Sequence, residues 1–252
     1  MKAAVLDGIG SKFEVREVEL DKPKSGELLV KVAASGLCAS DLNAVDGKRK
    51  LVPFPAVIGH EAAGVIVEVG ADVKGFSVGD HVIMSIVPSC GTCEYCASGR
   101  PNYCATAGNA MSVGGLFDGT SRLSQNGEKL NHFLTVASFA EYVVVPASGA
   151  VVIPDEMPLD RAALISCAVL TGYGAVMNTA KVKPGSTVAI FGCGGVGLNI
   201  VQGARMAGAT TIIAVDVTQE KLDLAKKVGA THVINGATSD PVAMVKEICG
   251  GV

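Results

Sequence analysis

The pattern that most constrains the fold is a glycine-rich turn between two apolar runs in the second half of the chain. It reads STVAIFGCGGVGLNIVQGARMAGATTIIAVD, from Ser186 to Asp216. A lone G-x-G-x-x-G motif is weak evidence, but here the glycines follow a β-branched run at 187–191 and open a helical pattern at 194–207. Further strands are predicted at 211–215 and 232–234, with an amphipathic helix at 219–228 between them. This alternation predicts the parallel sheet of a Rossmann domain.

The glycines and one aspartate of this stretch suit the binding of a dinucleotide. Gly192 permits the tight turn, Gly194 lets the backbone approach a pyrophosphate, and Gly197 lets helix and strand pack closely. Gly195 lies in the same loop and belongs to the predicted cofactor site. Asp216 ends the next strand, where a carboxylate accepts ribose hydroxyls and repels a 2′-phosphate, so NAD is predicted over NADP. The alternative is that Asp216 only caps the following helix.

Composition narrows the class of partner and the location. The chain has 252 residues, 49% of them hydrophobic, and a net charge of -3, so it has room for one large or two moderate domains. Without a long basic run, nothing attracts it to nucleic acid or anionic lipid, and a small neutral molecule is expected. The mean hydropathy is +0.42, but the charge-free run at 162–180 carries enough glycines and polar residues to predict a buried α/β segment, not a membrane span. The N-terminus lacks an export signal, so a cytoplasmic location is predicted.

Eight cysteines in such a chain should be reduced, and reduced cysteines that cluster usually bind metal. Four of them stand in the stretch CGTCEYCASGRPNYC, at Cys90, Cys93, Cys96 and Cys104. Thiolates two residues apart can reach one ion, and four thiolates close a tetrahedral shell. The spacing therefore predicts a structural zinc site. Coincidental cysteines or two disulfides are the alternative.

A histidine and a glutamate stand at the head of an apolar strand in VIGHEAAGVIVEVGADV, residues 57–73. Burying His60 and Glu61 without partners would cost several kcal/mol. Cys38 and Cys167 each follow an apolar run where the pattern breaks into glycine and polar residues, whereas the remaining two cysteines read as small buried hydrophobes. Cys38, His60 and Cys167 would make a two-sulfur, one-nitrogen zinc site with a fourth position free for water or substrate.

Together these motifs resemble the zinc-dependent medium-chain alcohol dehydrogenases of the long type, which carry a structural zinc loop. The G-H-E signature, the four-cysteine loop and the segments around Cys38 and Cys167 stand in that family's order over essentially the whole chain. The resemblance implies an α/β fold class, with a GroES-like β-barrel catalytic domain at 1–168 and part of a Rossmann domain at 169–252. A Rossmann sheet needs about six strands and three are found, so the chain is expected to be C-terminally incomplete. A homo-oligomer is implied for the full-length protein.

The resemblance also implies roles for the residues of the open site. Cys38, His60 and Cys167 would be the catalytic zinc ligands, with Glu61 as an occasional ligand or a carboxylate beside the metal. Asp41 would orient the zinc-bound histidine by accepting its other ring N–H.

Other positions receive a role from the same resemblance. Ser40 would pass the alcohol proton towards the cofactor ribose. Two further sets would contact the cofactor or line an apolar substrate pocket: Thr171, Val196 and Lys221 for the cofactor, and Ile86, Leu116, Phe133 and Leu134 for the pocket. The implied reaction is zinc- and NAD-dependent oxidation of an alcohol to an aldehyde or ketone by hydride transfer.

Two positions depart from the best-known members of this family. Asn43 stands where many have a relay histidine, and Ala39 where many have an arginine that binds the pyrophosphate. An amide does not titrate near neutral pH, so the departure at Asn43 bears on the route of proton exit, and that at Ala39 on the tightness of NAD binding.

The segment after the four-cysteine loop resembles the longer alcohol dehydrogenases, including the glutathione-dependent formaldehyde dehydrogenase branch. Glutathione would need fixed positive charge at the pocket mouth, for which Arg122 and Lys50 are the candidates. Neither matches a position of that branch, so a simple primary, allylic or aromatic alcohol is the predicted substrate. The alternative function is a non-catalytic zinc-binding fragment or structural protein derived from such a dehydrogenase.

Overall fold

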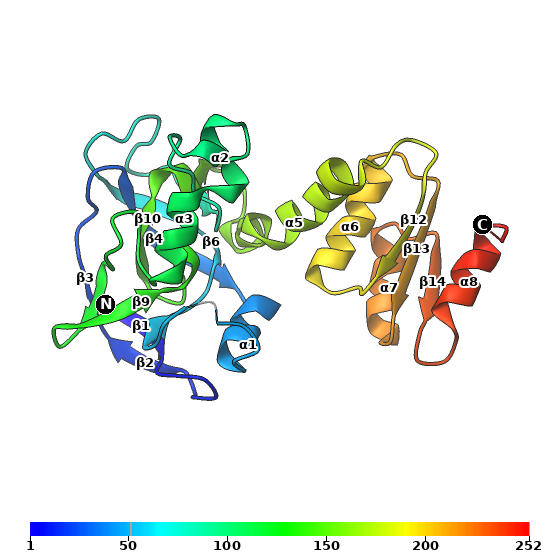
Figure 1. Ribbon diagram of the computed structural model, residues 1–252, viewed down its shortest axis with the longest axis horizontal. Coiled ribbons are helices and arrows are strands. Elements are labelled where there is room, and N and C mark those ends of the chain that lie inside the picture. Colours follow the sequence, from blue (N-terminus) through cyan, green and yellow to red (C-terminus); the bar gives the residue numbers. More distant parts are fainter. Residues whose placement is uncertain (51, 252) are drawn as a thin grey trace. The chain divides into compact units, whose positions relative to one another are not determined.

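The computed structural model describes residues 1–50 and 52–251. The chain divides into two compact units, Met1–Cys167 and Ala168–Val252, whose elements are labelled in Figure 1. Each unit has its own sheets and its own core, and the two are described in turn.

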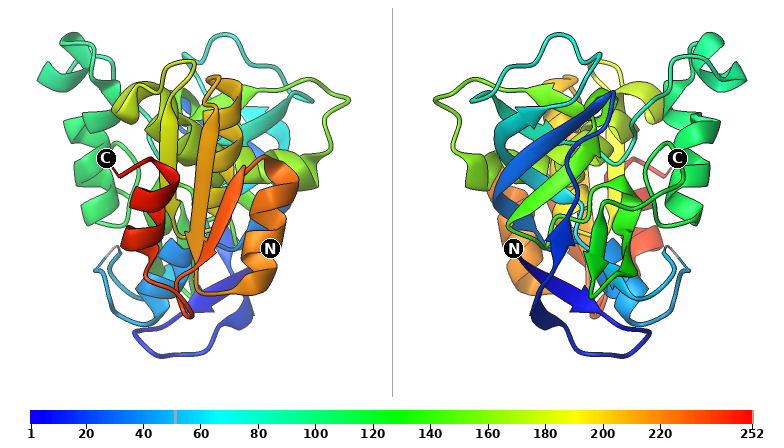
Figure 2. Two further views of the ribbon diagram at one scale, coloured as in Figure 1. Left: turned by 90° about the vertical axis from the view of Figure 1, so that its right-hand side faces the viewer. Right: turned by 90° about the vertical axis from the view of Figure 1, so that its left-hand side faces the viewer.

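Two β-sheets form the first unit. Among the described residues, one has the order β2-β1-β5-β9-β8-β3 and comprises β1 (Lys2–Leu6), β2 (Glu14–Glu17), β3 (Glu19–Leu20), β5 (Ala56–Val57), β8 (Leu123–Gln125) and β9 (Glu128–His132). The other has the order β10-β4-β6-β7-β11 and comprises β4 (Glu27–Gly36), β6 (Glu61–Val69), β7 (His81–Met84), β10 (Tyr142–Pro146) and β11 (Ala150–Val152). Neighbouring strands are antiparallel apart from β5 and β9, which pair in parallel. The view on the right of Figure 2 faces this unit.

Alternating apolar residues of the second sheet form a core that holds the strands in register. Leu28 and Val30 of β4 pack with Ile66 of β6 and Met84 of β7, and all four are fully or almost fully buried. Burying a side chain of this size contributes about 1.5–3 kcal/mol. The sheet is therefore a rigid base for the residues at the strand ends.

Short helices and turns join these strands. They are α1 (Ala39–Val45), α2 (Glu94–Ala97), η1 (Pro101–Tyr103), α3 (Ala105–Ser112), η2 (Phe133–Thr135), η3 (Ala147–Gly149), α4 (Leu159–Ala162) and η4 (Ala163–Ser166). The last of them packs on β4, β6 and β7. Cys167 is the C-terminal cap of this segment. It therefore lies at the same sheet as Cys38, which follows β4, and His60, which precedes β6.

The second unit is a parallel three-stranded sheet with helices on both faces. After α5 (Ala168–Gly174) and η5 (Ala175–Ala180), the sheet has the order β12-β13-β14, with β12 (Thr187–Phe191), β13 (Thr211–Asp216) and β14 (His232–Asn235). The helices between and after the strands are α6 (Gly195–Met206), α7 (Gln219–Val228) and α8 (Pro241–Ile248). The strands and helices predicted from the alternating pattern are confirmed to within a residue or two.

Successive residues of β13 point to opposite faces and bury different helices. Ile212 and Ala214 pack with Val201 of α6 and Leu222 of α7, while Ile213 packs in the cluster that α8 covers. Figure 1 and the left view of Figure 2 show α6 and α7 on one side of the three strands and α8 on the other. A continuous apolar strand such as TIIAVD is what two covered faces require.

Within the described residues, no single helix is long and apolar enough to cross a membrane. One bent pair of helical segments, Leu159–Ser166 with Ala168–Ala180, meets the requirement by length and composition.

Candidate metal centres and dinucleotide-binding loop

Four metal-binding side chains from distant parts of the sequence converge in the first unit. The ligand atoms of Cys38, His60, Glu61 and Cys167 all lie within 4.8 Å of one another; these four residues are called the open cluster below. The strand register explains part of this, because Gly36 of β4 pairs with Glu61 of β6. Cys38 follows two residues after Gly36 and so lies beside the start of β6.

Two glycines make room for the open cluster. A Cβ at Gly36 would lie 2.5 Å from Oε2 of Glu61 and 3.2 Å from Leu164. Gly59, which precedes His60, has φ +92° and a Cβ there would lie 2.8 Å from the ring of Phe139. Both the backbone angle and the lack of space favour glycine at the first position of the G-H-E signature.

Asp41 connects helix α1 to the histidine of the open cluster. Its Oδ2 accepts a hydrogen bond from the backbone N–H of Cys38 at 2.7 Å, which caps the helix, and its Oδ1 lies 3.0 Å from Nδ1 of His60. Both side chains are fully buried. With Nδ1 held by the carboxylate, Nε2 of His60 is buried and finds no hydrogen-bond partner among the described residues. A buried nitrogen lone pair among thiols is what a metal ion satisfies.

Burial and neighbouring groups shift the pKa values of three residues in the open cluster. Burial lowers the pKa of His60, but its hydrogen bond to Asp41 and the neighbouring charges of Asp41 and Cys38 outweigh this effect and raise the pKa to about 9. Hydrogen bonds from Cys167 and His60 lower the pKa of Cys38 to about 3. Burial, together with the neighbouring Cys38 charge, raises the pKa of Glu61. Cys38 is thus a thiolate at neutral pH, the form of cysteine that ligates metals.

The donor set of the open cluster fits zinc. Two sulfurs and one nitrogen suit this ion, and three protein ligands leave a coordination position for water or substrate. The carboxylate of Glu61 lies in the same cluster, as the resemblance implied. Ser40 lies in the first turn of α1, where its backbone N–H bonds to the sulfur of Cys38.

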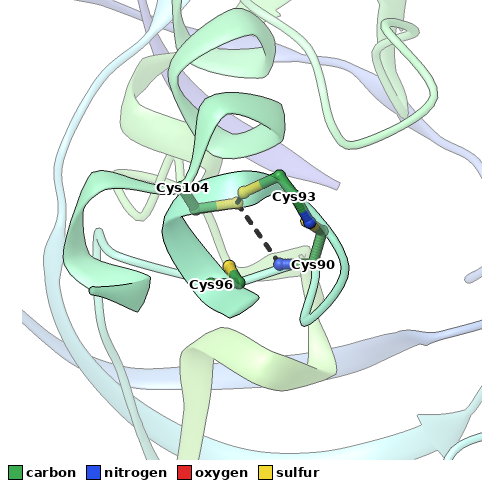
Figure 3. Close-up of side chains that lie close together, drawn as sticks. All are labelled: Cys90, Cys93, Cys96 and Cys104. Carbon is green, nitrogen blue, oxygen red and sulfur yellow. Dashed lines mark hydrogen bonds between the residues drawn. The ribbon is translucent and has the colours of Figure 1, made fainter. Parts of the chain in front are cut away.

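The four cysteines of the loop at 90–104 form a second cluster, called the closed cluster below. Figure 3 shows their sulfurs turned towards a common centre, and all four lie within 4.8 Å of one another. The sulfurs of Cys93 and Cys104 are 4.0 Å apart. Tetrahedral zinc with sulfur at 2.3 Å requires sulfurs about 3.8 Å apart, so the cluster fits one zinc ion and no water position.

Local turns position the closed cluster. Cys93 precedes α2 and Cys104 precedes α3. Backbone N–H groups point at the sulfurs, from Cys90 to Cys104 and from Cys93 to Cys90, each at 3.3 Å. The Thr106 hydroxyl and nearby backbone amides lower the pKa of Cys90 to about 5, whereas burial raises the pKa of Cys96 to about 11. The thiols of one cluster thus differ widely in pKa. A metal ion bound by all four would replace the protons of those that are still protonated.

The glycine-rich loop lies between β12 and α6 in the second unit, as predicted. Gly192 has φ +95°, which favours glycine, and Gly194 is the N-terminal cap of α6 with open space beside it. A Cβ at Gly197 would overlap the carbonyl oxygen of Gly192, so α6 can lie this close to the strand only with glycine there. Gly195 begins α6 and is exposed. The loop leaves the N-terminus of α6 accessible, as phosphate binding requires.

Asp216 joins the glycine-rich loop to the end of β13. Its carboxylate accepts the backbone N–H of Cys193 at 2.7 Å and that of Thr218 at 2.9 Å. These hydrogen bonds, the one from Cys193 first, lower the pKa of Asp216. The N-terminal cap of α7 is Thr218, so Asp216 does more than cap that helix, and a carboxylate with further lone pairs remains able to accept ribose hydroxyls.

The other residues assigned to the cofactor also belong to the second unit. Thr171 and Lys221 are exposed and Val196 is partly buried. Gly172 packs tightly on α6, because a Cβ there would lie 2.6 Å from Cβ of Asn199. Nothing further in the second unit tests their roles.

Arg122 is not the pocket-mouth cation considered from the sequence. Its side chain is 2% exposed and pairs with Glu27, at 3.0 Å from Nε and 2.6 Å from Nη2, and with Asp118 at 2.9 Å. The pairing with Glu27 could not be predicted from the residues around Arg122, because Glu27 lies 95 residues away. Arg122 therefore holds two segments of the first unit together and is not available to a ligand.

The assignment of pocket residues from the sequence is only partly matched by the cavity found in the first unit. Leu134 lines this cavity, whereas Ile86, Leu116 and Phe133 do not. The sequence analysis also named Lys50, but not the other residues that line this cavity: Ile9, Arg49, Val52, Pro53, Phe54, Met111 and Ser112. The apolar run LVPFPAV directly after three basic residues was the signal that could have found Val52, Pro53 and Phe54.

Comparison with known proteins places these sites in a family. Residues 24–155 match the alcohol dehydrogenase GroES-like domain, and residues 195–252 match the zinc-binding dehydrogenases. The chain belongs to the zinc-binding alcohol dehydrogenase family. The fold class, a GroES-like domain followed by a Rossmann-type domain, is thereby confirmed.

Relatives and solved structures agree with this placement. An S-(hydroxymethyl)glutathione dehydrogenase of Escherichia coli O139:H28 is 44% identical over 93% of this chain, which spans 63% of that protein. An alcohol dehydrogenase zinc-binding domain protein of Burkholderia ambifaria has a TM-score of 0.93 and 42% identity, covering 99% of this chain and 68% of the other. A benzyl alcohol dehydrogenase of Acinetobacter calcoaceticus has a TM-score of 0.91 and 40% identity, covering 98% and 67%.

The cofactors predicted from the sequence are supported by the same comparison. An alcohol dehydrogenase of E. coli solved with NADH has a TM-score of 0.79 and 31% identity, covering 99% of this chain and 66% of the other. The two donor clusters and the zinc-binding dehydrogenase match support zinc. The donor sets of the two clusters fit zinc, and the glycine-rich loop suits a dinucleotide.

Proposed function

We propose that this chain carries the zinc and NAD sites of an alcohol dehydrogenase, which oxidises an alcohol to an aldehyde or ketone. The observation that carries the proposal is the open cluster, in which a buried histidine nitrogen without a hydrogen-bond partner lies among two cysteines and a carboxylate. The chain spans 63% of the E. coli relative, so the activity is proposed for the protein of which this sequence forms the matching part.

The residues in and around the open cluster have separate proposed roles. Cys38, His60 and Cys167 are the proposed ligands of the catalytic zinc, with Glu61 beside them. Asp41 fixes the ring of His60 through Nδ1 and keeps Nε2 directed at the metal position. Burial of His60 and Glu61 excludes bulk water, which strengthens every electrostatic interaction inside the site.

Zinc, when bound, supplies a Lewis acid that lowers the pKa of a substrate hydroxyl, and NAD supplies the hydride acceptor. Ser40, in the first turn of α1 beside Cys38, is the proposed acceptor of the hydroxyl proton. In the second unit, Gly192, Gly194, Gly195, Val196 and Gly197 are the proposed pyrophosphate loop. Thr171, Asp216 and Lys221 complete the proposed cofactor contacts.

The closed cluster of Cys90, Cys93, Cys96 and Cys104 is the proposed structural zinc site. Its four sulfurs leave no position for substrate. Its function is to hold the loop that carries it.

A primary or aromatic alcohol is the proposed substrate. The similar proteins act, by name, on S-(hydroxymethyl)glutathione or benzyl alcohol, which both carry a hydroxymethyl group. The burial of Arg122 removes one of the two cations that a glutathione site could have used. This favours the aromatic alcohol.

Loading the protein with zinc and following NADH formation tests the function. We expect NADH formation with benzyl alcohol, little with NADP, and none after zinc is stripped by a chelator. Zinc binding without turnover of benzyl alcohol, ethanol, allyl alcohol or S-(hydroxymethyl)glutathione would support the alternative of a non-catalytic zinc-binding protein.

A cytoplasmic location and a homo-oligomeric full-length protein are also proposed. Two clusters of reduced cysteines suited to zinc support a reducing compartment. Fractionation of cells and sedimentation of the full-length protein test the two points.

A further inference from the structure

A cavity of about 520 Å³ opens in the first unit next to the residues that follow α1. Its floor is apolar, formed by Val52, Phe54, Met111 and Leu134, which pack in or against one core cluster. Ile9 closes one side. This volume lies in the range of small-molecule sites, and the floor suits an aromatic or aliphatic body.

Two cations, Arg49 and Lys50, also line this cavity. Both are exposed, and among the described residues neither has a carboxylate within ion-pair distance. Other basic side chains nearby are neutralised: Lys48 pairs with Asp46 at 2.8 Å. No acidic residue lines the cavity, so two adjacent positive charges stand unpaired beside an apolar floor in a chain whose net charge is -3.

The cavity and the open cluster share structural elements. Leu134 lines the cavity, and its neighbour Phe133 places its ring 5.6 Å from the ring of His60, edge to face. Arg49 follows α1, the helix that begins after Cys38, and its backbone N–H bonds to the carbonyl of Asn43 in that helix at 3.4 Å. Leu134 thus joins the cavity to the aromatic neighbour of His60, and Arg49 is hydrogen-bonded to the helix that begins after Cys38.

The backbone at Leu134 is strained in a way typical of functional sites. Leu134 has φ +51° and Thr135 φ +61°, the left-handed region that branched residues rarely occupy. Such strain persists only where the surroundings fix it, and it concentrates at ligand sites. Leu134, which lines the cavity, therefore has a backbone conformation that its surroundings must hold in place.

We propose that this cavity binds the body of the substrate and that Arg49 and Lys50 bind an anionic group on it. The substrate class is an alcohol or aldehyde with an aromatic or aliphatic body that carries a carboxylate or phosphate. This inference rests on the proposed dehydrogenase function. It departs from the small neutral molecule expected from composition, because the overall charge of a chain does not report the charge at one cavity.

The same lining argues against glutathione as the occupant. Glutathione carries an ammonium group and amides as well as carboxylates. The cavity offers no carboxylate for the ammonium, and Ser112 is its one uncharged polar side chain. An apolar body with a single anionic group matches the cavity better.

Calorimetric titration of the zinc-loaded protein tests the charge preference without relying on turnover. The ligands are 4-(hydroxymethyl)benzoate, 4-(hydroxymethyl)phenyl phosphate, and the neutral benzyl alcohol and 4-(hydroxymethyl)benzamide. We expect the anionic ligands to bind at least about three- to ten-fold more tightly at low salt, the range that one or two exposed charge pairs supply. The preference should shrink as salt is added. Which of the two anions binds more tightly decides between carboxylate and phosphate.

Variants then assign the preference to the two cations. Arg49→Gln with Lys50→Gln should remove the preference for the anionic ligands and leave the binding of benzyl alcohol unchanged. Lys48→Gln is the matched control, because Lys48 is adjacent and basic but pairs with Asp46, and it should change neither.

Three results would overturn the inference. They are equal binding of the anionic and neutral ligands by the unaltered protein, an equal loss in Lys48→Gln, and tighter binding of S-(hydroxymethyl)glutathione that survives the double substitution. NADH formation is measured in parallel. A charge preference that depends on Arg49 and Lys50 without any NADH formation would refute the proposed function and keep the anion site.

Discussion

The two metal-binding clusters of the first unit are built in opposite ways. The closed cluster comes from one loop at 90–104, in which Cys104 is the single buried residue. The open cluster joins Cys38, His60 and Cys167 from three distant segments, and both His60 and its partner Asp41 are completely buried. One is local and exposed, and the other is assembled by the sheet and enclosed.

This difference predicts a different dependence on metal. The loop of the closed cluster has little apolar surface to bury, so the metal must supply most of the free energy that orders it. The open cluster rests on β4 and β6, whose packing does not involve the cluster. Removing metal should therefore disorder the loop and leave the open cluster in place, able to bind zinc again.

The largest effect is expected where the open cluster loses a sulfur. Cys167→Ala should bind one zinc fewer and lose turnover by about a thousand-fold or more, because a metal Lewis acid contributes several kcal/mol to catalysis and each 1.36 kcal/mol is ten-fold. NAD binding should stay within a few-fold, since the glycine-rich loop belongs to the other unit. Zinc content, NADH formation and an NAD titration measure these.

Cys249→Ala is the matched control for this substitution. Cys249 follows α8 in the second unit and belongs to neither cluster. It should keep both zinc ions and full turnover. An active Cys167→Ala protein would exclude Cys167 as a ligand.

A sulfur removed from the closed cluster should act on structure before activity. Cys104→Ser should release one zinc and lower the free energy of local unfolding of the loop by several kcal/mol, because binding and folding are coupled in such sites. Limited proteolysis should cut within 90–104, while metal analysis still finds the zinc of the open cluster. A loop that stays protected without its zinc would show that the comparison between the clusters is wrong.

Asp41→Asn probes the open cluster through a residue that does not touch the metal position. The amide has the same size but not the charge that holds Nδ1–H of His60, so zinc affinity and turnover should fall about 10–100-fold. Competition with a zinc chelator measures the affinity. Asp46→Asn is the control on the same helix, since Asp46 is exposed and pairs with Lys48, and it should leave zinc affinity unchanged.

The same contrast between local and long-range construction decides what the sequence could predict. The closed cluster and the loop around Gly194 follow from spacing alone, because each is a local motif in which neighbours in sequence are neighbours in space. The residue types allowed Cys38, His60 and Cys167 to be grouped as a possible zinc site, but their roles as ligands came from the family resemblance, since no spacing rule connects Cys38 to Cys167. The register of Gly36 with Glu61, which brings Cys38 beside the start of β6, cannot be read from either strand alone.

The errors lie where long-range packing decides the environment of a charged residue. Arg122 reads as an available cation in the sequence, yet Glu27 and Asp118 bury it. Lys50 reads in the same way and does line a cavity. The residues directly next to Arg122 and Lys50 do not distinguish the two outcomes. Arg122 is buried by Glu27, which lies 95 residues away, together with the nearer Asp118, whereas Lys50 has no carboxylate partner among the described residues.

The smallest effect is expected at a second buried histidine, His132, which can be compared with His60 of the open cluster. His132 is fully buried like His60, but it has no carboxylate partner: its Nε2 accepts the backbone N–H of Arg122 at 3.2 Å. Burial, with the positive charges of Arg122 and Lys129, lowers the pKa of His132 to about 3.

Between about pH 6.5 and pH 3, His132 is therefore protonated in the unfolded chain and neutral in the folded chain. Stability from this group is complete above the unfolded pKa and is lost as the pH falls below it. Between pH 7.5 and 5.5 the loss should be about 1.4 kcal/mol, set by the unfolded pKa. In His132→Gln, the amide oxygen can still accept the Arg122 N–H. The free energy of unfolding in urea should therefore fall by about 1.4 kcal/mol less between pH 7.5 and 5.5 than in the unaltered protein. An unchanged dependence would mean that His132 takes up its proton as readily in the folded protein as in the unfolded chain, so that burial without an acidic partner does not lower its pKa.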